Sequence, residues 1–275
     1  MSPNIENIEE RNNKTFISVQ AKRMPRILIL ILSFIVISFL MKYISEWTHE
    51  FLGHCGFGAL VGGGIEGWYV SWFWPAEFGY AIVNFPISLG NFPRAVMMIG
   101  GITACFIAAL VSHSLILIIS KKKILPKKSI TTSTIIIFHV LFWYGFWAFV
   151  NSVGYLILGG LVNFGDIRQF SLLTGTPLWV FIIIGFLALV LFLYLVSFNS
   201  SIIFHPLLPN VRTRLLLSVF WLILPLTFLI MLLNPAITVP EWMIPAGIGA
   251  MLVPTLIMVV LGNKFQNNII WITSQ

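Results

Sequence analysis

The chain has 275 residues, of which 58% are hydrophobic and only 9% are charged, and its mean hydropathy is +0.96. Soluble globular domains do not reach these values, so the composition excludes a soluble protein and predicts an integral, multi-pass protein of the lipid bilayer. A positive-inside bias and contact with anionic lipid account for the net charge of +7. No basic face with interleaved aromatic residues is present, so we expect no nucleic-acid partner.

The chain begins with a polar tail, residues 1–26, which we expect to be cytoplasmic and disordered. No small-residue cleavage site follows the first apolar run, which therefore predicts an uncleaved signal-anchor. A span needs about 20 apolar residues, and charge-free stretches of that size predict an all-α polytopic membrane protein with about six transmembrane helices. These lie at about 27–46, 95–120, 130–160, 177–198, 214–234 and 243–262.

Lysine and arginine residues orient these predicted helices. Thirteen lie in the tail, in 121–128, in the 199–214 connection and beyond the last span, whereas the alternate connections hold two, Arg94 and Arg168. This bias predicts that both termini are cytoplasmic. We expect the plasma membrane of an archaeon or bacterium.

A polar seam ends the first apolar run, in EWTHEFLGHCGFG at 46–58. Ionisable groups within a span cost on the order of 2.5–3.5 kcal/mol each, so they must face protein, water or a metal. The seam indicates either a functional site or a structural network, in which Lys42 pairs with Glu46 and the histidines bond to neighbouring helices. On an α-helix, six residues share an arc of about 140°: Lys42, Glu46, His49, Glu50, Gly53 and His54.

His49 and His54, with Glu50 beside the first of them, are typical of zinc chemistry. Two imidazoles can share one metal with a third ligand from elsewhere, and the glutamate can act as general base. Three residues separate Glu50 from His54 instead of the usual two, so the imidazoles converge only if a π-bulge near Gly53 absorbs the extra residue. Two alternatives stay open: Glu50 and His54 bind the metal with no separate base, or the site binds no metal.

The stretch THEFLGHCGFGALVGGG resembles the metal-binding helix of the site-2 protease family of intramembrane zinc metalloproteases. The aromatic stretch GWYVSWFWPAEFGYAIVNFP at 67–86 stands where that family carries a hairpin dipping into the membrane. The resemblance therefore implies a short aromatic hairpin or re-entrant segment within 64–92; an aromatic belt at the membrane interface is the alternative. MMIGGITACFIAAL is similar to the family's small-residue helix.

The resemblance implies a metalloprotease-like membrane core over 27–170, followed over 171–275 by three further helices and a short cytoplasmic tail. It also implies an aspartate as third ligand. NFPISLGN at 84–91 offers Asn91, and NSVGYLILGGLVNFGDIRQ at 151–169 offers Asp166. We prefer Asp166, because the predicted first and third spans end on the same face of the membrane; a salt bridge with Arg168 is the alternative.

The remaining histidines and both cysteines predict packing roles. His113, His139 and His205 are expected to be hydrogen-bonded within a helix bundle. Cys55 and Cys105 are expected to be small apolar fillers, although Cys55 is also a candidate neighbour of the metal because it follows His54.

Together these features predict a membrane-embedded zinc metalloendopeptidase that hydrolyses a peptide bond of a membrane protein or peptide. Its metal ligands are His49, His54 and Asp166, and Glu50 is the general base. Asn151 is expected to bond the developing oxyanion or the substrate strand. The alternative is a non-catalytic protease-like scaffold or subunit of a membrane complex. A transporter is less favoured, because no matching pair of Gly/Pro-broken spans is present.

Overall fold

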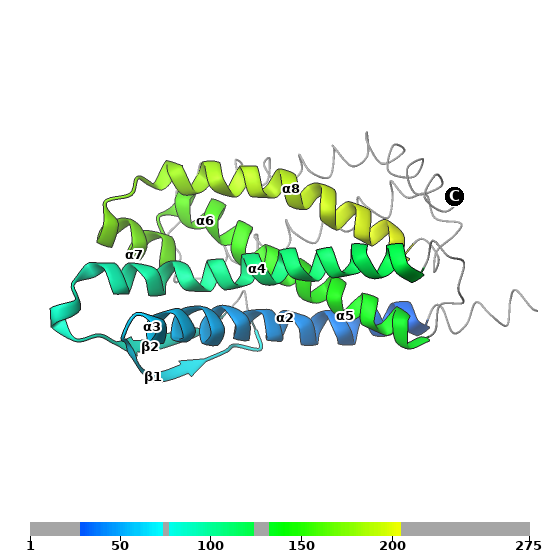
Figure 1. Cartoon of the computed structure of the whole chain (residues 1–275), viewed down its shortest axis with the longest axis horizontal. Coiled ribbons are helices and arrows are strands. Elements are labelled where there is room, and N and C mark those ends of the chain that lie inside the picture. Colours follow the sequence, from blue (N-terminus) through cyan, green and yellow to red (C-terminus); the bar gives the residue numbers. More distant parts are fainter. Residues whose placement is uncertain (1–27, 74–76, 124–131, 205–275) are drawn as a thin grey trace, which may run out of the picture.

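A computed structural model describes residues 28–73, 77–123 and 132–204 of the chain (Figure 1). Within these ranges, four helices are long and apolar enough to cross a membrane, which indicates a membrane protein. They are Leu28–Leu60, Asn91–Ser120, Ser133–Val162 and Leu178–Phe204, and they match the first four predicted spans. The predicted tail at 1–26, the spans at 214–234 and 243–262, and His205 lie outside the described residues.

The first long helix changes its hydrogen-bonding pattern along its length. Its segments are the π-helix η1 (Ser33–Ile37), α2 (Ser38–Trp47), the π-helix η2 (Thr48–Cys55) and α3 (Gly56–Leu60). A π-helical turn absorbs an extra residue while the backbone stays hydrogen-bonded. The helix therefore continues beyond the predicted end at residue 46, and the polar seam lies inside it.

A two-stranded antiparallel sheet follows, formed by β1 (Gly64–Tyr69) and β2 (Tyr80–Asn84). This sheet lies within 64–92, where the sequence predicted a short aromatic hairpin or re-entrant segment. Ala81 and Val83 of β2 are half-buried, and the residues that alternate with them are exposed. Whether this segment enters the membrane stays a prediction.

The other long helices run along the same axis in Figure 1. A short 3-10 turn, η3 (Ile87–Leu89), leads into α4, and α5 continues through a π-helix into α6. The bounds are α4 (Asn91–Lys123), α5 (Thr132–Phe149), η4 (Val150–Gly154), α6 (Tyr155–Val162), α7 (Gly165–Thr174) and α8 (Leu178–Phe204). Figure 1 places α3, α7 and the sheet at one end of the bundle.

Aromatic side chains fill the interior between α4, α5 and α8. Phe142, Trp143 and Phe146 of α5 and Phe192 and Phe204 of α8 are almost completely buried. The rings of Phe142 and Phe204 meet edge to face with their centroids 5.3 Å apart, a geometry that the ring quadrupoles favour.

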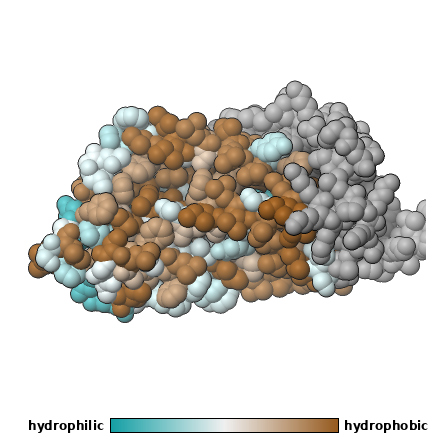
Figure 2. Space-filling view, in the orientation of Figure 1, coloured by the Kyte–Doolittle hydropathy of each residue, from teal (hydrophilic) through white to brown (hydrophobic). Residues whose placement is uncertain are grey.

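Large aliphatic side chains lie on the outside of the bundle instead. Leu187 and Val190 of α8 are more than 60% exposed, and α4 likewise exposes Ile107 and Val111. Figure 2 shows hydrophobic residues over most of the visible face, with hydrophilic residues gathered at the end that carries the sheet. A bundle that exposes apolar surface of this extent fits a lipid environment.

Glycines bring α4 unusually close to the histidine-bearing helix. A Cβ on Gly53 of η2 would collide with the backbone of Gly101, and one on Gly100 would lie 2.7 Å from the carbonyl oxygen of Gly53. Small residues allow such close approach between membrane helices. The small-residue stretch MMIGGITACFIAAL thus packs against the polar seam.

Candidate metal centre

The π-helix η2 brings His49 and His54 together. Their Nε2 atoms are 3.2 Å apart, and both residues are at most 5% exposed. A π-helix pairs residue i with residue i+5, so side chains five residues apart come to one face. The π-bulge predicted near Gly53 is therefore confirmed, and it resolves the extra residue between Glu50 and His54.

Asp166 completes a triangle with the two imidazoles. Its Oδ2 atom lies 3.1 Å from Nε2 of His49 and 3.2 Å from Nε2 of His54. The chain reverses before α7 through left-handed conformations at Asn163 (φ 51°) and Gly165 (φ 60°), and Asp166 stands in the first turn of α7.

Of the two candidates for the third ligand, the structure places only Asp166 beside the histidines. The competing Asn91 is exposed at the start of α4. In place of the alternative salt bridge with Arg168, the Oδ2 atom of Asp166 contacts both imidazoles.

The spacing and the chemistry of these three groups suit a metal ion. Zinc bound tetrahedrally at about 2.0–2.1 Å separates its ligand atoms by about 3.3–3.4 Å, close to the 3.1–3.2 Å observed here. Ligand atoms of His49, Glu50 and His54 also lie within 4.8 Å of one another, so this cluster could hold a metal ion. Glu50 therefore stands close enough to be either a ligand or a base.

Outer contacts orient both imidazoles. Nδ1 of His54 donates a hydrogen bond to the Met97 carbonyl oxygen at 2.8 Å, so in the neutral ring the lone pair is on Nε2. Nδ1 of His49 lies 4.0 Å from Sγ of Cys105, and that thiol donates to the Ser45 carbonyl oxygen at 3.6 Å. Metal-binding histidines usually have such a partner on the second ring nitrogen.

Gly101 provides the space directly beside these nitrogens. A Cβ at this position would lie 2.7 Å from Nε2 of His49 and 2.8 Å from Nε2 of His54. Any side chain larger than hydrogen would fill the volume in which an ion bound to both nitrogens would lie. Gly101 was not predicted as part of the site; the glycine pair in MMIGGITACF is the available signal in the sequence.

The charge of Asp166 suits a role as ligand. Burial of this carboxyl raises its pKa, but the positive charge of His54 and hydrogen bonds from both imidazoles outweigh burial and hold its pKa well below the ordinary value. Asp166 is therefore a carboxylate, the form that binds metals.

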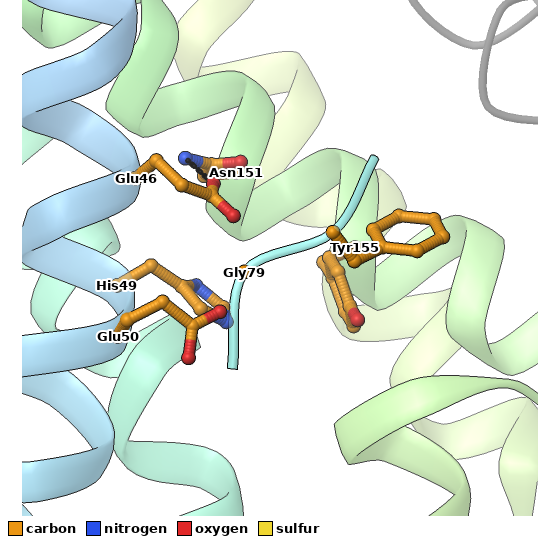
Figure 3. Close-up of a pocket in the computed structure, with 7 residues that line it drawn as sticks. Glu46, His49, Glu50, Gly79, Asn151 and Tyr155 are labelled. Carbon is orange, nitrogen blue, oxygen red and sulfur yellow. Dashed lines mark hydrogen bonds between the residues drawn. The ribbon is translucent and has the colours of Figure 1, made fainter. Parts of the chain in front are cut away.

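A small cavity of about 20 Å³ adjoins the centre (Figure 3). A cavity of about 10–15 Å³ is enough for one water molecule. The polar side chains around it come from the first long helix, from η4 and from α6: Glu46, His49, Glu50, Asn151 and Tyr155.

Asn151 lies at this cavity, but its amide is engaged by the first helix. Nδ2 donates to Oγ of Ser45 at 2.9 Å and to Oε2 of Glu46 at 3.2 Å. Both N–H groups of the amide are thereby used. The predicted role as an oxyanion donor would require one of these bonds to break.

Gly79 and Tyr155 are further neighbours of the site that were not predicted from the sequence. In Figure 3 the chain at Gly79 passes between the glutamates and Tyr155. A Cβ on Gly79 would lie 2.9 Å from Cγ of Glu50, and the ring of Tyr155 is centred 5.4 Å from that of His49. A lone glycine and a lone tyrosine in aromatic-rich stretches give no local signal of such contacts.

The other residues considered in the sequence lie away from the two Nε2 atoms and the Asp166 carboxylate. Lys42 donates to the carbonyl oxygen of Trp72 at 3.0 Å. His113 and His139 are buried and hydrogen-bonded to Asn199 and Ser33, which agrees with the predicted packing roles. Cys55 is fully buried, and it is Cys105, not Cys55, whose sulfur faces a histidine nitrogen.

Comparison with protein-family models found no matching family, and comparisons with curated proteins and with solved structures found no match either.

Proposed function

We propose that this chain is a zinc-dependent, membrane-embedded metalloendopeptidase, a multi-pass protein of the plasma membrane with both termini in the cytoplasm. The observation that carries the proposal is the convergence of the Nε2 atoms of His49 and His54 with Oδ2 of Asp166, at 3.1–3.2 Å, beside the carboxyl group of Glu50. Two imidazoles and a carboxylate, with a neighbouring glutamate, form a donor set typical of hydrolytic zinc sites.

In this proposal His49, His54 and Asp166 hold the ion. Zinc, when bound, would act as a Lewis acid on the substrate carbonyl and would make a neighbouring water more acidic. Glu50 takes a proton from water in the adjoining cavity as the water oxygen bonds to the carbonyl carbon. The C–N bond then breaks, and Glu50 returns the proton to the leaving amine.

Asn151 and Glu46 serve this site by positioning. Because the Asn151 amide holds the Glu46 carboxyl group, it fixes one wall of the cavity in which the water would lie. We therefore assign Asn151 a positioning role in place of direct contact with the oxyanion.

The test measures metal and cleavage together. The full-length protein is purified in detergent, zinc per chain is quantified by mass spectrometry, and cleavage of a quenched-fluorescent peptide library is followed. We expect about one zinc per wild-type chain, and loss of zinc in His49→Ala and Asp166→Ala. Glu50→Gln should keep zinc and lose about 10²–10⁴-fold in cleavage rate, the usual contribution of a general base.

Two results would contradict the proposal. Wild-type protein that binds zinc but cleaves no peptide would indicate a metal-binding scaffold or subunit. Wild-type protein that binds no zinc after exposure to micromolar zinc would overturn the metal site itself.

A further inference from the structure

A second, larger cavity of about 240 Å³ is also lined by Glu50. One wall carries the ionisable groups of the candidate metal centre, Glu50, His54 and Asp166. The remaining wall is mainly aromatic and thioether in character, with side chains from four segments of the chain: Phe78, Tyr80, Met97, Met98, Tyr155 and Phe164.

We propose that this cavity binds one large apolar side chain of the peptide substrate, on a residue next to the cleaved bond. The inference rests on the proposed function and names the substrate class for the same site. It makes the cavity the element that selects where a peptide is cut.

The size of the cavity sets the class of side chain. A cavity of about 150 Å³ is sufficient to bind benzene, so 240 Å³ accommodates a phenylalanine, leucine or methionine side chain. Aromatic and methionine side chains around it adapt to such groups and gain contact area from them.

The polar groups of the lining lie mainly on one wall. Among the described residues that line the cavity, those with carboxyl or imidazole groups are Glu50, His54 and Asp166, and Oδ2 of Asp166 lies 3.2 Å from Nε2 of His54. The side chains of the aromatic wall offer the hydroxyl groups of Tyr80 and Tyr155 and no charged group. A charged substrate side chain that reached this wall would therefore lose its water without gaining a charged partner.

Ala81 controls how deep a side chain can enter. It lines the cavity from β2 and is half-buried, whereas its neighbours Tyr80 and Ile82 are about half exposed. Leucine at position 81 would occupy part of the cavity. This position is not adjacent in the chain to any of the three proposed metal ligands. Met98, from α4, is half-buried and also lines the cavity, so its truncation would enlarge it.

The test uses full-length protein in detergent and fluorescein-labelled, alanine-based decapeptides with a single Phe, Leu, Ala or Asp at the centre. Binding is measured by fluorescence anisotropy with the Glu50→Gln variant, and cleavage sites are mapped with zinc-loaded wild-type protein. We expect the Phe and Leu peptides to bind about tenfold more tightly than the Ala peptide, within the range one or more methylenes give in an apolar pocket.

Variants of residues that line the cavity test whether the cavity causes the preference for Phe and Leu peptides. Ala81→Leu should weaken the Phe peptide about tenfold and leave the Ala peptide unchanged, whereas Ala59→Leu, the same change at an exposed position of α3, should leave both unchanged. Met98→Ala should shift the preference toward a Trp peptide. The zinc content of each variant shows whether it is folded. If Ala81→Leu binds no zinc, the result for Met98→Ala tests the inference by itself.

The outcomes separate this inference from the proposed function. Cleavage without side-chain preference, or equal weakening of all peptides by Ala81→Leu, overturns the cavity's role and leaves the protease proposal intact. Selective binding of Phe and Leu peptides without cleavage supports the cavity and overturns the protease. Displacement of a fluorescent fatty acid, together with no peptide binding, overturns both and indicates an acyl-chain site.

Discussion

Buried histidines occur in two regions of this molecule, and the two regions use them in opposite ways. His49 and His54 lie in the candidate metal centre, and His113 and His139 lie in the aromatic core; all four are at most 5% exposed. In the core, Nδ1 of His113 accepts a hydrogen bond from Asn199 at 3.0 Å, which places the proton of the neutral ring on Nε2. In the candidate metal centre, Nδ1 of His54 donates instead, so in the neutral ring the lone pair is on Nε2.

The surroundings of the second ring nitrogen differ as well. Nε2 of His113 and Nε2 of His139 have no hydrogen-bond partner in the described part of the chain, and their rings meet Phe142 and Phe204 edge to face. The Nε2 atoms of His49 and His54 face each other and a carboxylate. Burial of a histidine is therefore not enough for a candidate metal site, which also needs ring nitrogens that converge beside an anionic partner.

The largest difference between the two regions should appear when a proposed ligand is removed. Asp166→Ala or His54→Ala is expected to weaken zinc binding by more than the roughly 10–100-fold that loss of an outer contact costs, because one of three ligand atoms is gone. His113→Ala, in the aromatic core, should leave zinc at about one per chain. Isothermal titration with zinc of chelator-stripped protein measures this. Equal loss in both regions would show that zinc binds elsewhere or that the variants unfold.

A methyl group beside the imidazoles should have the next largest effect. Gly101→Ala places a Cβ 2.7–2.8 Å from both Nε2 atoms, so we expect zinc affinity to fall by about 10–100-fold, comparable to the loss of an outer-shell contact. Overpacking should also lower the free energy of unfolding by about 1–3 kcal/mol, measured by SDS titration in mixed micelles.

Gly145→Ala is the matched control in the aromatic core. Its Cβ would lie 3.0 Å from Cβ of Ser112 and 3.1 Å from Nε2 of His113, so it also crowds a histidine. It should destabilise the protein without changing zinc affinity. Unchanged zinc binding in Gly101→Ala would contradict the position of the ion beside this glycine.

Removal of the buried amides should separate catalysis from stability. Asn151→Ala and Asn199→Ala each leave a buried polar group without a partner, so each should lower the free energy of unfolding by about 1–3 kcal/mol. Only Asn151 bonds to Glu46 at the small cavity. We therefore expect slower peptide cleavage in Asn151→Ala alone, beyond the effect of any unfolded fraction. Equal cleavage rates per folded molecule in Asn151→Ala and Asn199→Ala would show that Asn151 has no role in cleavage.

The smallest expected effect concerns the two cysteines. Cys105→Ala removes the sulfur that lies 4.0 Å from Nδ1 of His49; because thiols are weak hydrogen-bonding groups, zinc affinity should fall by less than about tenfold. Cys55→Ala should not change it, although Cys55 is buried to the same degree. Competition with a fluorescent zinc chelator resolves such differences. A larger effect for Cys55 would restore the role as metal neighbour suggested by its place after His54.

Much of the helical framework could be predicted, because hydropathy is a property of each segment by itself. The apolar stretches near 95–120, 130–160 and 177–198 match helices of the structure closely. The π-bulge at Gly53 could also be predicted, since the i to i+5 spacing of His49 and His54 permits convergence only in a π-helix. The extension of the first helix to Leu60 could not, because its polar residues interrupt the apolar pattern that marks a span.

The candidate site divides in the same way. The residue types of His49, Glu50 and His54 and their place on one helix follow from the sequence alone, and the count of spans favoured Asp166 over Asn91. The packing of distant segments is what brings Asp166, 117 residues away from His49, to both imidazoles. It also decided that Gly101 leaves room beside them and that the Met97 carbonyl sets the tautomer of His54. Periodicity and hydropathy describe one segment, whereas these contacts depend on how closely two helices pack, and that distance is set by glycines whose partners lie in another part of the chain.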